Sequence, residues 1–263
     1  MLRSLTLGVL AAAFVATAAA AERPMKVFIL AGQSNMFGQG RVKDLPAELK
    51  KPHPRVFRFE GGKWKPLRPD WSFGPEVTFG RAMAENFPRH RIGIVKLAKG
   101  STSLVAWSPE WKPEFARITS DAKEGFYAKL MEQVRAAMKT PGARVAGMLW
   151  MQGERDSCVG ALAPKYAERL RALITAVRRD TRCPALPFVF GRISNGKAGG
   201  YRHVEVVRAQ MTAFRMSGVK MIDTDDLSHR EDKLHYNSAG QVMLGRRFAE
   251  AMAAMLSAKG NRD

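Results

Sequence analysis

Short apolar runs alternate with amphipathic segments along most of the chain, and this alternation restricts the fold more than any other feature. The apolar runs lie at 26–31, 92–98, 145–151, 187–191 and 219–223. Segments with apolar residues at helical spacing lie at 75–87, 121–139, 164–179, 201–216 and 238–256. Short, nearly unbroken apolar runs are typical of strands buried on both faces of a parallel sheet. We therefore predict an α/β fold, a three-layer α/β/α sandwich around a five-stranded parallel sheet with right-handed crossovers.

The N-terminal segment differs in composition from the rest of the chain. A short basic start at 1–3 precedes an apolar, Ala-rich stretch at 5–20, and the small residues at 19–21 suit a signal-peptidase site. We expect 1–21 to be a signal peptide and 22–263 to be one domain, so the protein is exported, to the periplasm or beyond the cell. An uncleaved membrane anchor is the alternative, but the run is short for a span and lacks a stop-transfer flank.

The charge of the chain is strongly positive. It contains 43 Lys and Arg against 24 Asp and Glu, a formal net charge of +19. Such a surface attracts anionic partners, here acidic polysaccharide, lipopolysaccharide or an envelope surface, or is simply a solvated basic surface. Nucleic acid is not expected, because the sequence carries no nucleic-acid-binding motif and the chain is predicted to be exported.

The two cysteines, Cys158 and Cys183, flank the predicted helix at 164–179. That helix is about 24 Å long at ~1.5 Å per residue. A disulfide needs Cα atoms within ~7 Å of each other. We therefore predict two free thiols, although export would permit a bridge.

A serine follows the first predicted strand directly, in the sequence Gly32-Gln33-Ser34-Asn35. The carboxyl ends of strands are where open α/β sheets bind their ligands. Ser34 is therefore either a nucleophile or merely the cap of the next helix. A nucleophile requires a base, an orienting acid and oxyanion donors from elsewhere in the chain.

Two Asp-x-x-His units stand near the C-terminus, Asp226/His229 and Asp232/His235. Three-residue spacing lets a carboxylate reach Nδ1–H of the histidine, which leaves Nε2 free to take a proton from a serine. The same residue types also bind metals, but no pair here has the helical two-histidine spacing of zinc enzymes. We therefore predict no metal site.

The second unit, Asp232/His235, is the better candidate for the base. It lies just before the last predicted helix, with Asn237 or Ser238 as the N-cap, so it would be held rigidly. The first unit is closer to the fifth strand and suits a substrate loop. Taken without Ser34, His235 is better explained as a surface histidine or one at the start of a helix.

The segment at 38–73 is irregular, basic and aromatic, and its role is open. It contains one predicted hairpin, 55–59 with 63–67, around Gly61-Gly62. It either lines a sugar cleft or forms a surface flap with one packed face.

Four blocks occur in a recognisable order: Gly-Gln-Ser-Asn at 32–35, Lys-Gly-Ser-Thr at 99–102, Gln-Gly-Glu at 152–154, and Asp-x-x-His at 232–235. This order resembles the SGNH hydrolases, and specifically the sialate O-acetylesterase-like branch that includes carbohydrate esterase family 6, with its acetylxylan esterases. The resemblance spans nearly all of the mature chain and implies an SGNH/flavodoxin-like fold.

The resemblance implies roles for individual residues. Ser34 matches the nucleophile, His235 the general base and Asp232 its partner. The oxyanion hole would consist of the N–H groups of Ser34 and Gly100 and the side-chain amide of Gln152, where many SGNH enzymes have Asn.

Three neighbours of these residues are candidates for substrate binding: Gln33, Asn35 and Glu154. For Glu154, and for Asp156 beside it, bracing of the loop is the favoured alternative.

The implied activity is that of an exported serine esterase which removes O-acetyl groups from an acetylated polysaccharide or from sialic acid through an acyl-enzyme. No cofactor or metal is implied, and no stable membrane insertion is expected after cleavage. A lipid or thioester hydrolase on the same scaffold and a non-catalytic glycan-binding protein are the alternatives.

Overall fold

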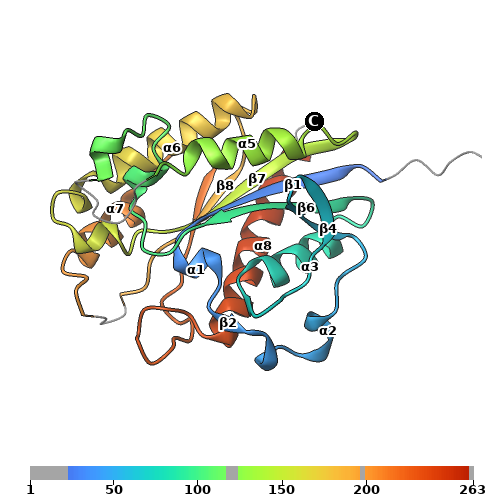
Figure 1. Ribbon diagram of the computed structural model, residues 1–263, viewed down its shortest axis with the longest axis horizontal. Coiled ribbons are helices and arrows are strands. Elements are labelled where there is room, and N and C mark those ends of the chain that lie inside the picture. Colours follow the sequence, from blue (N-terminus) through green and yellow to red (C-terminus); the bar gives the residue numbers. More distant parts are fainter. Residues whose placement is uncertain (1–22, 117–123, 196–198, 261–263) are drawn as a thin grey trace, which may run out of the picture.

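The computed structural model describes residues 23–116, 124–195 and 199–260, so the predicted signal peptide lies outside the described residues. The chain forms three layers, a central sheet with helices on each face (Figure 1). Helices α5 (Tyr127–Ala137) and α6 (Tyr166–Asp180) cover one face. Helices α3 (Glu76–Asn86) and α8 (Ser238–Gly260) pack together on the other. The predicted α/β/α sandwich is confirmed.

The central sheet has seven strands in the order β4-β3-β6-β1-β7-β8-β9. These are β1 (Met25–Gly32), β3 (Val56–Glu60), β4 (Lys63–Pro66), β6 (Arg91–Ala98), β7 (Ala143–Met151), β8 (Phe188–Gly191) and β9 (Val219–Ile222). All neighbouring strands are parallel except β3 and β4. A separate small sheet joins β2 (Gly40–Arg41) to β5 (Ser72–Phe73).

The five predicted strands are all present, but the prediction of a five-stranded sheet is too small by the two strands of the hairpin. Strand β3 pairs in parallel with β6, with Val56 opposite Ile92, and β4 forms the antiparallel edge. Burial explains the difference, because Val56 and Phe59 in β3 are almost fully enclosed. The hairpin is therefore part of the core sheet and is not only a surface flap.

The predicted helices appear with shorter ends in several cases. The segment predicted at 201–216 forms α7 (Val204–Ala213), which packs against α6. The one predicted at 121–139 is helical from Tyr127, and residues 121–123 lie outside the described residues. Two short helices, α1 (Ser34–Phe37) and α2 (Ala47–Lys50), belong to the segment after β1.

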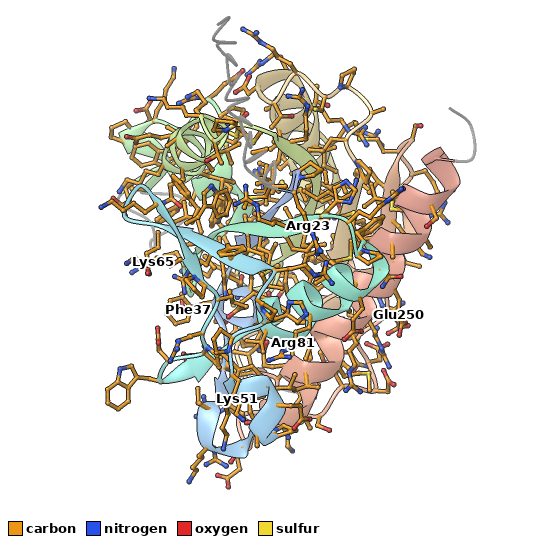
Figure 2. All side chains as sticks on the ribbon, turned by 90° about the vertical axis from the view of Figure 1, so that its right-hand side faces the viewer. Arg23, Phe37, Lys51, Lys65, Arg81 and Glu250 are labelled. Atoms are coloured by element: carbon orange, nitrogen blue, oxygen red, sulfur yellow. The ribbon has the colours of Figure 1, made fainter. Side chains whose placement is uncertain are left out.

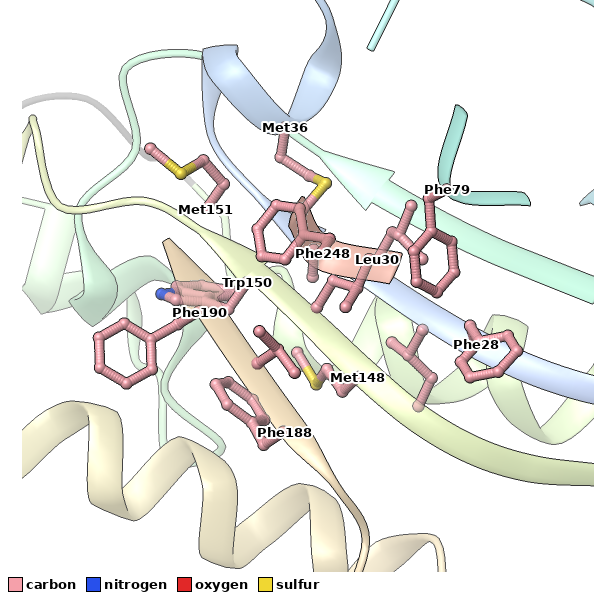
Figure 3. Close-up of a cluster of buried hydrophobic side chains, with 14 of the residues drawn as sticks. Phe28, Leu30, Met36, Phe79, Met148, Trp150, Met151, Phe188, Phe190 and Phe248 are labelled. Carbon is pink, nitrogen blue, oxygen red and sulfur yellow. The ribbon is translucent and has the colours of Figure 1, made fainter. Parts of the chain in front are cut away.

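The core lies on both faces of the sheet and joins it to the helices. Large apolar side chains of β1, β7 and β8 meet Phe79 of α3 and Phe248 of α8 in one buried cluster (Figure 3). Burial on both faces explains why these strands have nearly continuous apolar sequences. Strand β1 is at the centre, and its residues from Val27 to Ala31 are fully buried.

Two further expectations concern the cysteines and the membrane. Cys158 and Cys183 are both free, as the length of the helix between them predicted. In the described part of the chain, no helix combines the length and the apolar character that crossing a bilayer requires.

Candidate active site

The candidate site lies where the strand order reverses. The chain passes from β1 to β3 and β6 on one side of β1, and later to β7, β8 and β9 on the other side. At the carboxyl edge, Gly32 of β1 is level with Ala98 of β6 and with Met151 of β7. The loops that follow these three strands therefore leave the sheet side by side, at the position where open α/β sheets bind ligands.

The turn after β1 requires a glycine. Gly32 has a φ of +148°, and a Cβ on it would lie 2.0 Å from the carbonyl oxygen of Met151. The next residue, Gln33, donates its N–H to that same carbonyl at 2.9 Å. This close contact between β1 and β7 turns the chain sharply, so that Ser34 becomes the first residue of α1.

Ser34, His235 and Asp232 form a continuous hydrogen-bonded series. Ser34 Oγ lies 3.0 Å from His235 Nε2, and His235 Nδ1 lies 2.8 Å from Asp232 Oδ2. The other carboxylate oxygen, Asp232 Oδ1, accepts the N–H groups of Leu234 at 2.9 Å and of His235 at 2.8 Å. The structure thus brings together three residues that are 201 and 3 positions apart in the sequence.

The carboxylate of Asp232 is held ionised. Burial alone would raise the pKa of Asp232, but hydrogen bonds from the backbone and ring of His235 and from the N–H of Leu234 outweigh it and hold the pKa at about 2. An ionised carboxylate accepts the proton on Nδ1 of His235, so Nε2 is left to accept the hydroxyl proton of Ser34. This is the tautomer that a general base requires.

Asn35 fixes the loop that carries the histidine. Its Nδ2 donates to the carbonyl of Leu234 at 3.2 Å, and its Oδ1 accepts the N–H of Tyr236 at 3.0 Å. The two bonds lie on either side of His235. Because Asn35 follows Ser34 directly, this clamp sets the distance between hydroxyl and imidazole.

The start of α8 supports the same loop. Asn237 caps the helix, since its Oδ1 accepts the N–H of Gly240 at 3.0 Å, as the sequence predicted for Asn237 or Ser238. The N–H of Asn237 donates to the carbonyl of Ser228 at 3.0 Å, and the N–H of Arg230 donates to the carbonyl of His235 at 2.7 Å. These hydrogen bonds join the two ends of the loop that carries His235, directly before α8.

The other Asp-x-x-His unit has different partners. Both carboxylate oxygens of Asp226 accept from the guanidinium of Arg247, each at 2.5 Å. The ring of His229 packs against Tyr236, with the ring centroids 4.9 Å apart. Within the described residues, no hydrogen bond joins Asp226 to His229, and Nε2 of His229 is buried without a partner.

Two of the three predicted oxyanion donors are close together and free. A Cβ on Gly100 would lie 3.8 Å from Cβ of Ser34, so the loop after β6 runs directly beside the serine. In the part of the chain that is described, neither Ser34 nor Gly100 gives its N–H to another protein group. Both N–H groups are available to a ligand at the Ser34 hydroxyl.

The third predicted donor, Gln152, is engaged elsewhere. Its fully buried side-chain amide donates to Thr102 O at 2.9 Å and to Asp156 Oδ2 at 2.6 Å, and lies 3.4 Å from Gln33 Oε1. No proton of this amide remains for an oxyanion. The structure therefore places Gln152 as a brace between the loops after β6 and β7, and corrects the predicted role.

The three residues predicted to bind substrate are also internal. Gln33, Asn35 and Glu154 are 3 %, 1 % and 3 % exposed, and Glu154 Oε1 accepts from Asn35 Nδ2 at 2.8 Å. Burial raises the pKa of Glu154, although the hydrogen bond from Asn35 opposes this. A bound sugar cannot reach side chains this deeply enclosed, so bracing, the alternative considered for Glu154, is what the structure supports.

Sequence reasoning missed the residues that hold these braces. Tyr166 of α6 donates its hydroxyl to the carbonyl of Gln152 at 2.7 Å, and the N–H of Leu104 donates to Asp156 Oδ2 at 2.9 Å. Nothing in the sequence singles out Tyr166, because its spacing marks it as an ordinary buried position of a helix. The adjacency of Asn35 to Ser34 was the one available sign of a clamp.

Comparison with known proteins identifies the family. The family model described as "Carbohydrate esterase, sialic acid-specific acetylesterase" matches residues 24–254. The chain belongs to this family of carbohydrate esterases, as the four sequence blocks predicted. It is a carboxylic ester hydrolase, and its activity at the level of the family is that of a carbohydrate acetylesterase.

Individual relatives agree with this. A probable carbohydrate esterase from Arabidopsis thaliana is 29 % identical over 253 residues, covering 87 % of this chain and 90 % of its own. The X-ray structure of that Arabidopsis protein has a TM-score of 0.74 at 24 % identity, covering 88 % of this chain and 98 % of its own.

Two other solved structures share the fold. NanS has a TM-score of 0.69 at 17 % identity, covering 90 % of this chain and 99 % of its own. A carbohydrate acetylesterase from Xanthomonas citri has a TM-score of 0.69 at 21 % identity, covering 89 % of this chain and 57 % of its own.

Proposed function

We propose that this protein removes O-acetyl groups from a carbohydrate, with Ser34 as nucleophile, His235 as general base and Asp232 as its orienting partner. The observation that carries the proposal is the series Ser34 Oγ–His235 Nε2–Asp232, with separations of 3.0 and 2.8 Å. Nucleophile and base within hydrogen-bond reach, with the base oriented by a third group, define an activated serine.

The first half of the reaction forms an acyl-enzyme. His235 Nε2 takes the hydroxyl proton as Ser34 Oγ attacks the acetyl carbonyl, and Asp232 stabilises the imidazolium. The tetrahedral oxyanion is bound by the N–H groups of Ser34 and Gly100. One preorganised donor of this kind is typically worth ~3–4 kcal/mol of transition-state stabilisation. His235 then protonates the sugar oxygen as the C–O bond breaks.

The second half releases acetate. A water molecule loses a proton to His235 and attacks the acetyl group on Ser34, and collapse of the second tetrahedral intermediate returns the proton from His235 to Ser34. The products are one sugar hydroxyl and one acetic acid, which releases its proton to solvent as acetate, and the triad ends in its starting protonation state. His235 makes each proton transfer of the two bond-breaking steps.

The substrate class is an acetylated polysaccharide or an acetylated sialic acid. The description of the family and the names of the relatives support a carbohydrate ester. We also propose that the chain is exported after removal of residues 1–21, on the strength of its apolar, Ala-rich leader. The net charge of +19 supports retention of the exported protein at an anionic polysaccharide or envelope surface.

Acetate release tests the proposal. Acetylated xylan, acetylated pectin and O-acetylated sialic acid are each incubated with the purified protein and with Ser34→Ala. We expect acetate from at least one substrate and none above background with Ser34→Ala. Ser228→Ala, which alters an exposed serine in the loop before the triad histidine, is the matched control and keeps full activity. Equal acetate release by Ser34→Ala and Ser228→Ala would refute the assigned nucleophile.

A further inference from the structure

A cavity of about 760 Å³ lies next to the candidate active site, and we call it the hairpin cavity. Its walls are the turn of the β3–β4 hairpin, the last residues of β6, the exposed side of α5, and the segment around Trp71 before β5. Phe37 also lines it. Figure 2 shows Phe37 on the same side of the molecule as Lys65 of the hairpin.

The lining of the hairpin cavity includes residues that lie close in the chain to Ser34 and Gly100, although these two residues are not themselves part of it. Phe37 is the last residue of α1, which starts at Ser34, and the next N–H, that of Gly38, donates to the carbonyl of Ser34 at 3.0 Å. Ala98, also in the wall, ends β6 two residues before Gly100. A chain-like ligand with an ester at Ser34 can therefore continue into this cavity.

Two exposed aromatic residues line the hairpin cavity. Within the described residues, four large apolar side chains are exposed: Phe37, Trp71, Val206 and Met243. The two aromatic ones, at 55 % and 96 % exposure, both belong to this cavity. Exposed apolar groups that gather at one hollow mark a binding site rather than a random surface. Aromatic faces supply large contact area at specific geometry, which suits the C–H face of a sugar ring.

The charge of the hairpin cavity differs from that of the whole chain. Its lining contains the cations Arg58, Lys96 and Lys129 and the carboxylates Glu60, Asp70, Glu76 and Glu132, so three positive charges face four negative ones. The chain as a whole is formally +19. Two of the cations are paired inside the cavity, Lys96 with Glu76 at 2.5 Å and Arg58 with Glu60 at 3.5 Å. The lining offers hydrogen-bonding groups without an excess of positive charge to attract an anionic chain.

We infer that the hairpin cavity is a subsite for a neutral saccharide chain and holds sugar units adjacent to the one whose acetyl ester reaches Ser34. The inference rests on the proposed esterase function. Phe37 and Trp71 pack against sugar rings, and the exposed charged side chains of the lining and Gln133 bind the hydroxyl groups, whereas Lys96 and Glu76 are buried as a pair. The volume lies within the range of ~300–1,000 Å³ typical of ligand sites.

Binding of an ester-free oligosaccharide tests the subsite without relying on turnover. The affinity of the parent protein for xylohexaose, and for a hexamer of galacturonic acid, is measured by titration calorimetry. We expect xylohexaose to bind more tightly than the acidic hexamer. Trp71→Ala weakens xylohexaose binding by about tenfold or more, since an aromatic face that packs on a sugar ring supplies a large contact area. Val206→Ala, an exposed apolar residue outside the cavity, stays within twofold of the parent.

Three results would contradict the proposed subsite. These are no binding of xylohexaose, unchanged xylohexaose binding after Trp71→Ala, and tighter binding of the acidic hexamer than of xylohexaose. Trp71 is so exposed that its removal is not expected to unfold the protein, and thermal unfolding of the variant verifies this.

Turnover of 4-nitrophenyl acetate separates this inference from the proposed function. Ester hydrolysis without xylohexaose binding refutes the subsite and leaves the esterase intact. Xylohexaose binding without any ester hydrolysis refutes the esterase function, and the cavity is then a glycan-binding site alone. If the protein both hydrolyses the ester and binds xylohexaose, we expect Trp71→Ala to raise KM for acetylated xylohexaose more than KM for 4-nitrophenyl acetate.

Discussion

The two Asp-x-x-His units have the same spacing and lie six residues apart, yet the structure uses them differently. In Asp232/His235, the carboxylate binds Nδ1 of the ring and two backbone N–H groups of its own loop. In Asp226/His229, the carboxylate binds the guanidinium of Arg247 on α8, and the ring packs against Tyr236.

Competition for the carboxylate explains the difference. A two-oxygen, two-nitrogen pairing with an arginine is among the strongest hydrogen-bonded arrangements available to a carboxylate. Arg247 therefore holds Asp226 away from its histidine, and lowers the pKa of Asp226 as it does so. Asp232 makes its hydrogen bonds within its own turn and is free to orient His235. Spacing makes a dyad possible, but the neighbouring cations decide whether it forms.

The largest expected effect comes from the two histidines. We predict that His235→Ala lowers kcat for ester hydrolysis by at least ~10⁴-fold, because the members of a triad act as one unit. His229→Ala should change kcat by less than about threefold, since the His229 ring packs against Tyr236 and its Nε2 makes no hydrogen bond within the described residues. Steady-state kinetics on a soluble acetate ester would measure both. Loss of turnover in His229→Ala with activity retained in His235→Ala would reverse the comparison.

Substitution of the two aspartates should show the same difference on a smaller scale: kcat should fall with the change at Asp232 and not with the change at Asp226. Asp232→Asn is predicted to lower kcat by about 10²–10⁴-fold, because an amide at this position favours the wrong tautomer of the histidine. Asp226→Asn removes charge from an exposed pair with Arg247, and kcat should stay near that of the parent. The measurement is kcat with both proteins shown to be folded by circular dichroism. Comparable losses in the two variants would mean that Asp226 also serves the reaction.

Removal of the clamp should have a moderate effect. Asn35→Ala frees the chain on both sides of His235, and a misplacement of about 1 Å can cost ~10²-fold in rate. We predict a 10- to 100-fold lower kcat with little change in KM, which identifies a positioning residue rather than a substrate contact. The matched control is Asn86→Ala, an exposed asparagine whose side chain donates only to the carbonyl of Ala82. A rise in KM with kcat unchanged would restore the predicted role of Asn35 in substrate binding.

The smallest effect concerns stability and pH. Burial lowers the pKa of His229, and the nearby carboxylate of Asp232 opposes this only in part. The unfolded chain, with a histidine pKa of about 6.5, binds a proton before the folded one does. Stability contributed by the neutral ring is therefore present above pH ~6.5 and is lost as the pH falls toward the lower pKa of the folded state.

His229→Gln removes this titration. Urea unfolding at pH 7.5 and pH 5.5 should show a smaller loss of stability on acidification in His229→Gln than in the parent. Thr181→Ala, remote from the loop on the far end of α6, keeps the pH dependence of the parent. A parent and a His229→Gln variant with identical pH dependence would mean that the ring of His229 is as solvated as in the unfolded chain.

The sequence was sufficient for those parts of the molecule that depend on local pattern. The apolar runs located β1, β6, β7, β8 and β9, because strands buried on both faces need continuous apolar residues. The motifs also located Ser34 and the histidine loop, since both lie at the ends of regular elements. The sequence also predicts the hairpin, but it does not predict that β3 pairs with β6. Parallel pairing between distant segments produces no pattern in the sequence of either segment.

The interior of the site was beyond sequence reasoning for a related reason. The family resemblance predicts Gln152 in the oxyanion hole, yet its amide protons go to Thr102 and Asp156. Amide side chains donate wherever acceptors are packed against them, and only the fold decides which acceptors those are. The same holds for Asn35, whose two partners on the histidine loop lie about 200 positions away.

The central claim is that Asp232/His235, and not Asp226/His229, activates Ser34. The most direct measurement is the rate at which a fluorophosphonate probe modifies Ser34, followed by peptide mass mapping in the parent, His229→Ala and His235→Ala proteins. Phosphonylation of a serine requires its activation but no acetylated substrate, so the choice of sugar does not enter. We predict modification of Ser34 at similar rates in the parent and in His229→Ala, and essentially none in His235→Ala. Modification of Ser34 in His235→Ala at the rate of the parent, or its loss in His229→Ala alone, would contradict the account.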